Sequence, residues 1–281
     1  MSMDRLITEL RAEEQLHLKR LEQCRESLRE LLGDDGDDSA PVASLEEFLS
    51  ERNTDFQWII GGSIATGSVG MLVADPAVGK TTLLVQLALC LSVGRSPWYN
   101  APVSRVVPTL YVIAEGSRAA FQSRVETARE SLDVPRDAGW FIQQKHVTDY
   151  KIGGSTLEAM IRRSRAGLVI LDTVGYFWTG DENSAVEWKA SVMKPLRDMV
   201  ARYGCTFLLV HHQVKATINR TGWQKARGTS AMFADLDFFW QLEPVEGDDA
   251  GTARNLVQSK NKYGQVQRWD LRFDATRARF G

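Results

Sequence analysis

Cysteine is scarce in this 281-residue sequence: Cys24, Cys90 and Cys205 lie far apart and form no Cys-x-x-Cys pair. This scarcity argues against a disulfide framework or a zinc site and indicates reduced thiols in a cytoplasmic protein. Long apolar runs are missing as well, since none reaches the roughly 18 residues that a membrane-spanning helix needs. The opening residues, Met1–Arg5, contain no apolar signal core. These absences predict a cytoplasmic protein with no membrane partner.

A strong excess of charge of one sign is also missing. The chain carries a formal net charge of −2, so the overall balance does not indicate a nucleic-acid-binding protein. The stretch 254–281 departs from this balance, with seven basic and two acidic side chains. Such a patch can bind phosphate groups, although a solvated surface accounts for it equally well.

The length and the 43% hydrophobic content fit one large α/β domain with an appendage. Residues 1–32 are predicted to form a helical arm, residues 33–54 an acidic linker and lead-in, and residues 55–281 the main domain. Glu14 and His17 interrupt the heptad core of the arm, which consists of Ile7, Leu10, Leu21, Cys24, Leu28 and Leu31. We expect the arm to serve oligomerisation or a partner; a helix packed on its own domain is the alternative.

From Val69 onward, apolar runs alternate with amphipathic stretches, which indicates a parallel sheet wound with helices. Strands are predicted over 69–74, 109–114, 168–172 and 206–211, and helices over 80–93, 118–132 and 185–203. Three further strands, at 236–242, 253–259 and 266–273, have short connections and are expected to be antiparallel. The predicted fold is therefore α/β, with a mainly parallel central sheet extended by C-terminal antiparallel strands.

The segment Ala74–Thr81 reads Ala-Asp-Pro-Ala-Val-Gly-Lys-Thr and joins the first strand to the first helix. This is the pattern of a P-loop, whose backbone N–H groups surround phosphate oxygens at a helix N-terminus. Lys80 would reach the β- and γ-phosphates, and the Thr81 hydroxyl would ligate Mg²⁺. Ala74 stands where the pattern has glycine, at little cost if it keeps a negative φ. The predicted ligands are ATP and Mg²⁺, and the predicted nucleotide-binding residues of the loop are Ala77, Val78, Gly79, Lys80, Thr81 and Thr82.

Two carboxylates follow other predicted strands. Asp172 ends the apolar run Leu168–Leu171 and is predicted to hold the metal and its water shell; a helix cap is the alternative. Glu115 follows the strand 109–114, so it should lie across the site from Lys80, because parallel strands end at one edge of the sheet. We expect Glu115 to be the catalytic base, with a surface acid as the alternative.

Two histidines, His211 and His212, end the strand predicted at 206–211. Adjacent histidines without a nearby acid or thiol are weak zinc ligands. His212 is predicted to sense the γ-phosphate. His211 remains a candidate core histidine, because adjacent strand residues point to opposite faces.

Together these elements resemble the RecA-like family of hexameric replicative helicases, and most closely the plasmid RepA type, over roughly residues 55–273. The resemblance rests on six short segments: Gly-Lys-Thr-Thr at 79–82, Ala-Glu at 114–115, Leu-Asp-Thr at 171–173, Asp-Glu-Asn-Ser at 181–184, His-His at 211–212 and Arg-Gly-Thr-Ser at 227–230. It implies a hexameric ring that hydrolyses ATP between subunits and moves single-stranded DNA through its pore. A loader or another replication or recombination partner would then bind the N-terminal helix.

The resemblance also implies roles for residues outside the P-loop. Arg124 stands where the family stacks an arginine on adenine, with a solvent-facing helix residue as the alternative. Asp237 occupies the place of the RepA-type arginine finger, which is a departure. Lys260 and Lys262 are similar to the Lys-x-Arg pair of DnaB-like helicases, but a lysine cannot bridge two oxygens in a planar fork. The pair is nevertheless predicted to act in trans, as a finger on a turn between two predicted strands that projects toward a neighbouring subunit.

The loop 213–227 is predicted to contact DNA. It contains Trp223 and no acid, which suits a single strand, although a solvated surface loop is the alternative. The cations predicted to contact DNA are Lys215, Arg220, Lys225 and Arg227. The main functional hypothesis is a DNA-linked ring ATPase; a recombinase-like or clock-type ATPase, or a nucleotide-gated scaffold acting through the N-terminal helix, remains open.

Overall fold

The computed structural model describes residues 44–50, 57–138, 140–144, 151–181, 184–212 and 230–281. The chain divides into two units between Asn53 and Thr54. Of the first unit, the structure describes Ser44 and helix α2 (Leu45–Ser50). The predicted helical arm 1–32 lies outside the described residues, so the arm and the linker stay predictions.

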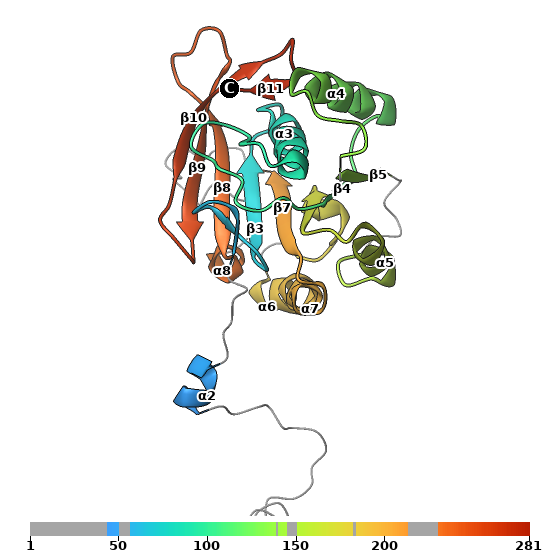
Figure 1. Cartoon of the computed structure of the whole chain (residues 1–281), viewed down its shortest axis with the longest axis vertical. Coiled ribbons are helices and arrows are strands. Elements are labelled where there is room, and N and C mark those ends of the chain that lie inside the picture. Colours follow the sequence, from blue (N-terminus) through green and yellow to red (C-terminus); the bar gives the residue numbers. More distant parts are fainter. Residues whose placement is uncertain (1–43, 51–56, 139, 145–150, 182–183, 213–229) are drawn as a thin grey trace, which may run out of the picture. The chain divides into compact units, whose positions relative to one another are not determined.

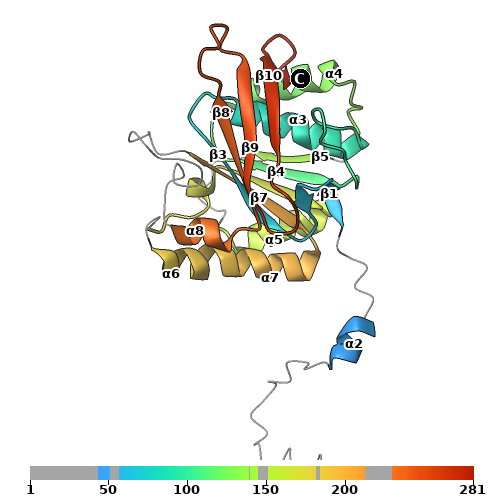
Figure 2. The same cartoon turned by 90° about the vertical axis from the view of Figure 1, so that its left-hand side faces the viewer.

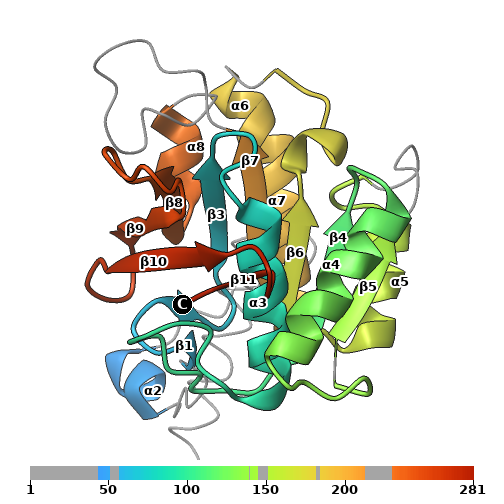
Figure 3. The ribbon, with the colours of Figure 1, turned by 90° about the horizontal axis from the view of Figure 1, so that it is seen from above.

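The second unit is built on a nine-stranded sheet with the order β11-β10-β9-β8-β3-β7-β6-β4-β5 (Figure 1). The six strands from β8 to β5 run parallel to one another, and β9, β10 and β11 continue the sheet in antiparallel fashion. Figure 3 shows the parallel strands side by side. The parallel strands are β3 (Val69–Ala74), β4 (Thr109–Ile113), β5 (Trp140–Gln144), β6 (Leu168–Asp172), β7 (Thr206–His212) and β8 (Phe238–Pro244). The antiparallel strands are β9 (Ala253–Asn261), β10 (Arg268–Asp274) and β11 (Arg279–Phe280), and β1 (Trp58–Ile60) pairs with β2 (Ile64–Ala65) in a separate hairpin.

Helices cover both faces of the sheet, as Figure 2 shows. Helices α3 (Lys80–Val93) and α4 (Arg118–Ser131) pack on one face. The other face is covered by α5 (Ser155–Ser164), by α8 (Ser230–Asp235) and by one continuous helical stretch. That stretch consists of α6 (Ala185–Trp188), a π-helical turn (Lys189–Met193) and α7 (Lys194–Tyr203), and a short 3-10 helix (Val174–Tyr176) follows β6.

Strand β3 shows why the central strands are apolar throughout. All six of its residues are buried, because successive side chains of a strand point to opposite faces and each face is covered by helices. Val69, Met71 and Val73 enter the core cluster beneath α7. Leu72 and Ala74 enter the cluster beneath α3. A continuous apolar run is therefore the expected signature of this strand.

The predicted α/β architecture is confirmed, with strands at 69–74 and 168–172 and a helix at 80–93 as expected. The expected direction of the strand predicted at 236–242 was wrong. It forms β8 and runs parallel to β3, because helix α8 precedes it and parallel strands are usually joined through a helix. Six further elements were not predicted from the sequence: β1, β2, β5, α5, α8 and β11. Within the described part of the chain, no helix is long and apolar enough to cross a membrane.

Asp237, the residue before β8, contacts β3, α7 and the segment that follows β9. Its carboxylate is buried and accepts hydrogen bonds from the Val69 amide, 2.8 Å away, and from Arg197 of α7, 2.5 Å away. The Lys262 ammonium lies 3.6 Å from the second carboxylate oxygen. Burial raises the pKa of Asp237, but the bonds from Arg197 and Val69 and the two cationic charges outweigh it and leave the pKa below its ordinary value.

Asp237→Asn is expected to lower the free energy of unfolding by about 2–3 kcal/mol, because Arg197 and Lys262 lose their anionic partner while remaining partly desolvated. The depressed pKa means that the carboxylate stabilises the fold above about pH 4 and that this contribution is lost as pH falls through the folded-state pKa. Urea unfolding at several pH values measures both effects.

Asp270→Asn is the matched control, since Asp270 pairs with Arg268 on the exposed face of β10; its effect should stay within about 0.5 kcal/mol. Equal stabilities for the two variants at neutral pH would show that Asp237 does not organise this edge.

Candidate nucleotide site

The carboxyl ends of four neighbouring strands, β3, β7, β6 and β4, meet at one edge of the sheet. Each strand delivers one functional segment there: the P-loop after β3, His212 at the end of β7, Asp172 at the end of β6 and Glu115 shortly after β4. Ligands bind in open α/β sheets at this edge, because the loops that follow the strands surround a common crevice. The topology therefore brings together residues that lie far apart in the sequence. Ala74 and His212, for example, are separated by 138 positions.

The P-loop turn has two residues in the left-handed region, Ala77 at φ 65° and Gly79 at φ 112°. Gly79 is the residue before α3, so the first N–H groups of that helix face the cavity side of the turn. Ala74 is absent from the positive-φ residues among those described. The condition under which alanine is expected to be tolerated at this position is therefore met.

Lys80 is buried against its own loop. Its Nζ atom donates to the carbonyl oxygens of Ala74 and Asp75, each 3.0 Å away, and lies 3.5 Å from Nδ1 of His212. Burial lowers the pKa of Lys80, while the carboxylates of Asp172, Glu115 and Asp75 oppose that shift. The ammonium is thus fixed in position at the centre of the site.

Asp172 lies beneath the start of α3. Its Oδ2 atom accepts hydrogen bonds from the Thr81 hydroxyl, 3.2 Å away, and from the Tyr111 hydroxyl, 2.7 Å away. Burial raises the pKa of Asp172, and the two hydrogen bonds oppose the increase. Tyr111 itself is fully buried, and burial together with the adjacent carboxylate raises its pKa well above the ordinary value.

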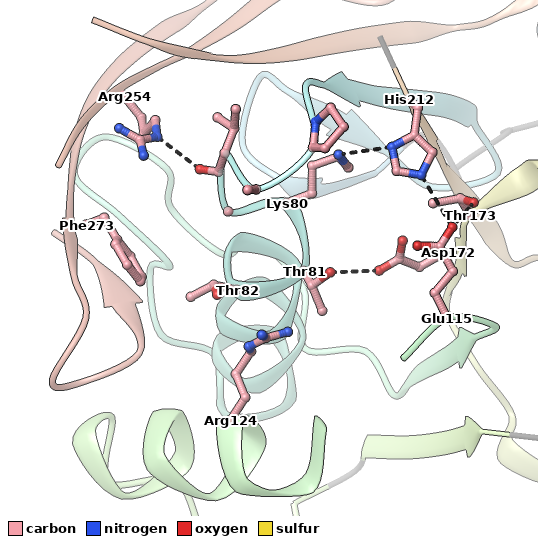
Figure 4. A pocket seen from close by; sticks show the side chains of 14 residues that line it. Lys80, Thr81, Thr82, Glu115, Arg124, Asp172, Thr173, His212, Arg254 and Phe273 are labelled. Carbon is pink, nitrogen blue, oxygen red and sulfur yellow. Dashed lines mark hydrogen bonds and ion pairs between the residues drawn. The ribbon is translucent and has the colours of Figure 1, made fainter. Parts of the chain in front are cut away.

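Glu115, His212 and Thr173 form a second group beside Lys80 (Figure 4). The Nε2 atom of His212 lies 3.3 Å from Oε1 of Glu115, and the Thr173 hydroxyl donates to the same oxygen at 3.1 Å. Glu115 keeps 40% of its side chain exposed, so its carboxylate is both positioned and accessible to water. His211 points away from this group and is buried, with Nδ1 2.9 Å from the His212 carbonyl oxygen.

One cavity of about 470 Å³ joins these groups. All predicted nucleotide-binding residues, Ala77–Thr82 and Arg124, line it, as do Glu115, Asp172 and His212. Arg254 of β9 and Phe273 of β10 also line it, on the side away from His212 (Figure 4). From the sequence, Arg254 stands out only within the basic stretch, and Phe273, Thr173 and Tyr111 are not predicted to be site residues. Their proximity depends on strand pairing, which no local motif indicates.

Thr81 and Asp172 provide oxygen donors that could hold a magnesium ion. A hydroxyl and a carboxylate within 3.2 Å at a phosphate-binding loop are oxygen donors of the kind that Mg²⁺ prefers. In the described part of the chain, no three His, Cys, Asp or Glu side chains cluster closely enough to hold a metal by themselves. An ion at this position would therefore need nucleotide oxygens and water to complete its coordination shell.

Lys260 and Lys262 lie at the amino ends of the parallel strands, away from this cavity, where β9 ends beside the start of β8. Lys260 belongs to β9 rather than to a turn, which corrects the prediction, because the strand continues to Asn261. Its Nζ atom donates to the carbonyl oxygens of Phe233 and Ala234 at 2.8 and 2.7 Å. Lys262 keeps 60% of its side chain exposed beside Asp237. The predicted DNA contacts, Lys215, Arg220, Lys225 and Arg227, lie outside the described residues.

The fold and the loop together define a P-loop ATPase domain with a RecA-like sheet. The chain belongs to the family whose model is described as an AAA domain, which matches residues 37–217.

Two further comparisons agree with this class. The chain is 27% identical over 229 residues to the DNA repair protein RadA of Pseudomonas aeruginosa; the alignment covers 79% of this chain and 43% of RadA. The chain thus spans less than half the length of that relative. A solved structure described as an ATPase domain superposes with a TM-score of 0.62 at 12% identity, covering 88% of this chain and 99% of that domain. At that identity, the likeness shows the fold.

Tyr111→Phe is expected to lower the free energy of unfolding by about 1–2 kcal/mol, because the buried Asp172 carboxyl loses one of its two hydroxyl donors. Tyr176→Phe removes a hydroxyl from a side chain that is 51% exposed and should leave stability unchanged. Thermal and urea unfolding of both variants provide the measurement. Indistinguishable stabilities would mean that the Tyr111 hydroxyl does not support the acid.

Proposed function

We propose that this chain is an ATP-hydrolysing ring motor that acts on single-stranded DNA, of the RepA-like hexameric replicative helicase type. The observation that carries the proposal is the convergence of Lys80, the Thr81–Asp172 pair and the Glu115–His212 pair on one cavity next to a P-loop. These are the parts that phosphoryl transfer to water requires: a phosphate cradle, a metal site and a positioned base.

Each side chain has a role that follows from its surroundings. The P-loop amides and Lys80 bind the phosphates, and Arg124, on the exposed side of α4, covers the base. A magnesium ion held by Thr81 and Asp172 would neutralise charge on the β- and γ-phosphates. Glu115 takes a proton from the attacking water, and Thr173 and His212 keep its carboxylate oriented toward the cavity. His212 links this base to Lys80, so it is placed to respond to the γ-phosphate.

The position of Lys262 supports hydrolysis between subunits. It lies at the edge where β8 begins, whereas the P-loop lies where β3 ends, and β3 and β8 are parallel. The six residues of β3 span five steps of about 3.3 Å, so the two ends of this strand lie about 16 Å apart. Lys262 therefore does not reach the cavity of its own chain. Its exposed ammonium is available to a neighbouring chain, whereas Lys260 is bound to α8. We therefore favour Lys262 over Lys260 as the finger.

DNA as the partner is supported by the cationic composition of the loop 213–227 and by the similarity to the DNA repair protein RadA. A second candidate, an ATPase that serves DNA repair, is favoured by the match to the DNA repair protein RadA over 79% of the chain. Strand displacement distinguishes the two candidates, because a ring motor is stimulated by single strands and also displaces a paired strand. An ATPase indifferent to DNA would point to the nucleotide-gated scaffold.

Glu115→Gln is expected to retain nucleotide affinity and to lose ATP turnover by about 10²-fold or more, the effect of removing a positioned base. Lys80→Ala should lose turnover together with phosphate affinity. Phosphate release, with and without single-stranded DNA, and nucleotide titration provide the measurements, with Asp270→Asn as a surface control. Near-normal turnover in Glu115→Gln would remove this residue from the mechanism and with it the proposed chemistry.

Lys262→Ala is expected to bind ATP and to hydrolyse it slowly, because a trans-acting cation can contribute about 10³-fold or more. Mixing it with Glu115→Gln subunits should partly restore turnover, since some interfaces then contain one intact Glu115 and one intact Lys262. The measurement is an ATPase titration at constant total protein after subunit exchange has been verified. In the control mixture, Arg268→Ala, which removes an exposed cation from β10, replaces Lys262→Ala. Turnover that follows the sum of the separate activities would show that each chain completes its own site.

A further inference from the structure

The C-terminal strands contact the P-loop at two consecutive residues. The Nε atom of Arg254, on β9, donates to the carbonyl oxygen of Val78 at 2.9 Å. The ring of Phe280, on β11, lies against Gly79: a Cβ atom at Gly79 would come within 2.9 Å of it. Two residues of the phosphate-binding turn are therefore held by strands that follow them by more than 170 positions.

Gln86 attaches β11 to the P-loop helix. It is buried on α3, and its side-chain amide makes two hydrogen bonds with the backbone of Phe280. Nε2 donates to the Phe280 carbonyl oxygen at 2.8 Å, and Oε1 accepts from the Phe280 amide at 2.6 Å. The amide thus acts as a strand partner for β11. Separating the two would leave four buried polar groups without these bonds, so the contact is specific.

Further contacts fix β11 from the other sides (Figure 1). Arg279 donates to the Ser131 carbonyl oxygen at the end of α4, 3.0 Å away, and Arg272 and Gly281 exchange two backbone hydrogen bonds of 2.9 Å. The rings of Phe273 and Phe280 have centroids 5.3 Å apart. Because Phe273 lines the nucleotide cavity, β11 is packed between the cavity wall and the helix that begins at the P-loop.

We propose that β11 is a clasp that holds the P-loop in its nucleotide-binding conformation, with Gln86, Phe280 and Arg254 as positioning residues. The inference rests on the proposed nucleotide site and adds the element that shapes it. Gly79 has the freest backbone in the turn, and contacts at Val78 and Gly79 restrict that freedom before a ligand arrives. Pre-organisation of this kind increases affinity because less order has to be gained on binding. By linkage, nucleotide binding must stabilise the docked clasp by the same factor.

If β11 only stabilised the fold, weakening its attachment would affect nucleotide binding no more than an equivalent change elsewhere. Gln258 provides the matched control for this comparison. It is equally buried, on β9, and its amide makes the same kind of double hydrogen bond, with the carbonyl and hydroxyl of Ser63 at 3.0 and 3.2 Å. Ser63 lies in the β1–β2 hairpin and lines no part of the nucleotide cavity. Gln258→Met removes the two bonds to Ser63, whereas Gln86→Met removes the two bonds to Phe280 and a bond from Nε2 to the Pro97 carbonyl oxygen. Only Gln86→Met touches the clasp.

The experiment is a titration of the full chain with a fluorescent ADP analogue and Mg²⁺, at a temperature where every variant is folded by circular dichroism. Gln86→Met is expected to bind about tenfold more weakly than Gln258→Met, the scale of losing one to two net hydrogen bonds. Phe280→Ala should weaken binding in the same direction and serves if Gln86→Met does not fold. Arg254→Met should weaken binding relative to Arg268→Met, which alters an arginine outside the cavity.

Hydrogen exchange of the unmodified protein provides the independent readout. Amides of the segment 275–281 should exchange more slowly when ADP and Mg²⁺ are bound, whereas amides of the β1–β2 hairpin should not change. Wild-type affinity in Gln86→Met and Phe280→Ala, with no nucleotide effect on exchange at 275–281, would overturn the clasp. Failure of the unmodified protein to bind nucleotide would instead refute the proposed function.

Discussion

The turn between β3 and α3 has to keep two residues in the left-handed region while directing its amides toward one cavity. Ala77 and Gly79 adopt φ values of 65° and 112°, and for alanine this conformation costs about 1–2 kcal/mol. Such a turn persists only where its surroundings determine it. Those surroundings are the buried strand below, the buried helix beyond and the contacts of Arg254 and Phe280 with Val78 and Gly79. The remaining site residues are arranged around this turn.

The two ends of the parallel strands lie in different chemical environments. Where β3, β4, β6 and β7 end, a lysine, two acids and a histidine surround a cavity that suits a nucleotide. Where β3 and β8 begin, Asp237 is neutralised by Arg197 and Lys262. The acid at position 237 thus has a structural role where β3 and β8 begin. The nearby cation Lys262 lies on the surface, which is where a contact with a second chain would be made.

Much of the fold and of the site was predictable because its signals are local. Val69–Ala74 is a continuous apolar run that leads into a loop of recognisable spacing, and Gly94 ends the helix that follows. Asp172 and His212 end apolar strands, so the rule that parallel strands end together predicts that they meet. The rest depends on tertiary pairing. The direction of β8 depends on the path of the chain after His212, and β11 is only two residues long. The placement of Tyr111 beside Asp172 follows from the register of β4 and β6, in which Ile113 pairs with Asp172.

We propose that catalysis is shared between chains, so that the activity of each chain depends on its neighbours. The most direct measurement is the rate of phosphate release per chain at saturating ATP and Mg²⁺, followed as the protein is diluted, with and without single-stranded DNA. Catalysis shared between chains predicts a rate per chain that falls on dilution as assemblies dissociate and that rises when DNA is added. A rate per chain that stays constant over the whole dilution range and does not respond to DNA would contradict it.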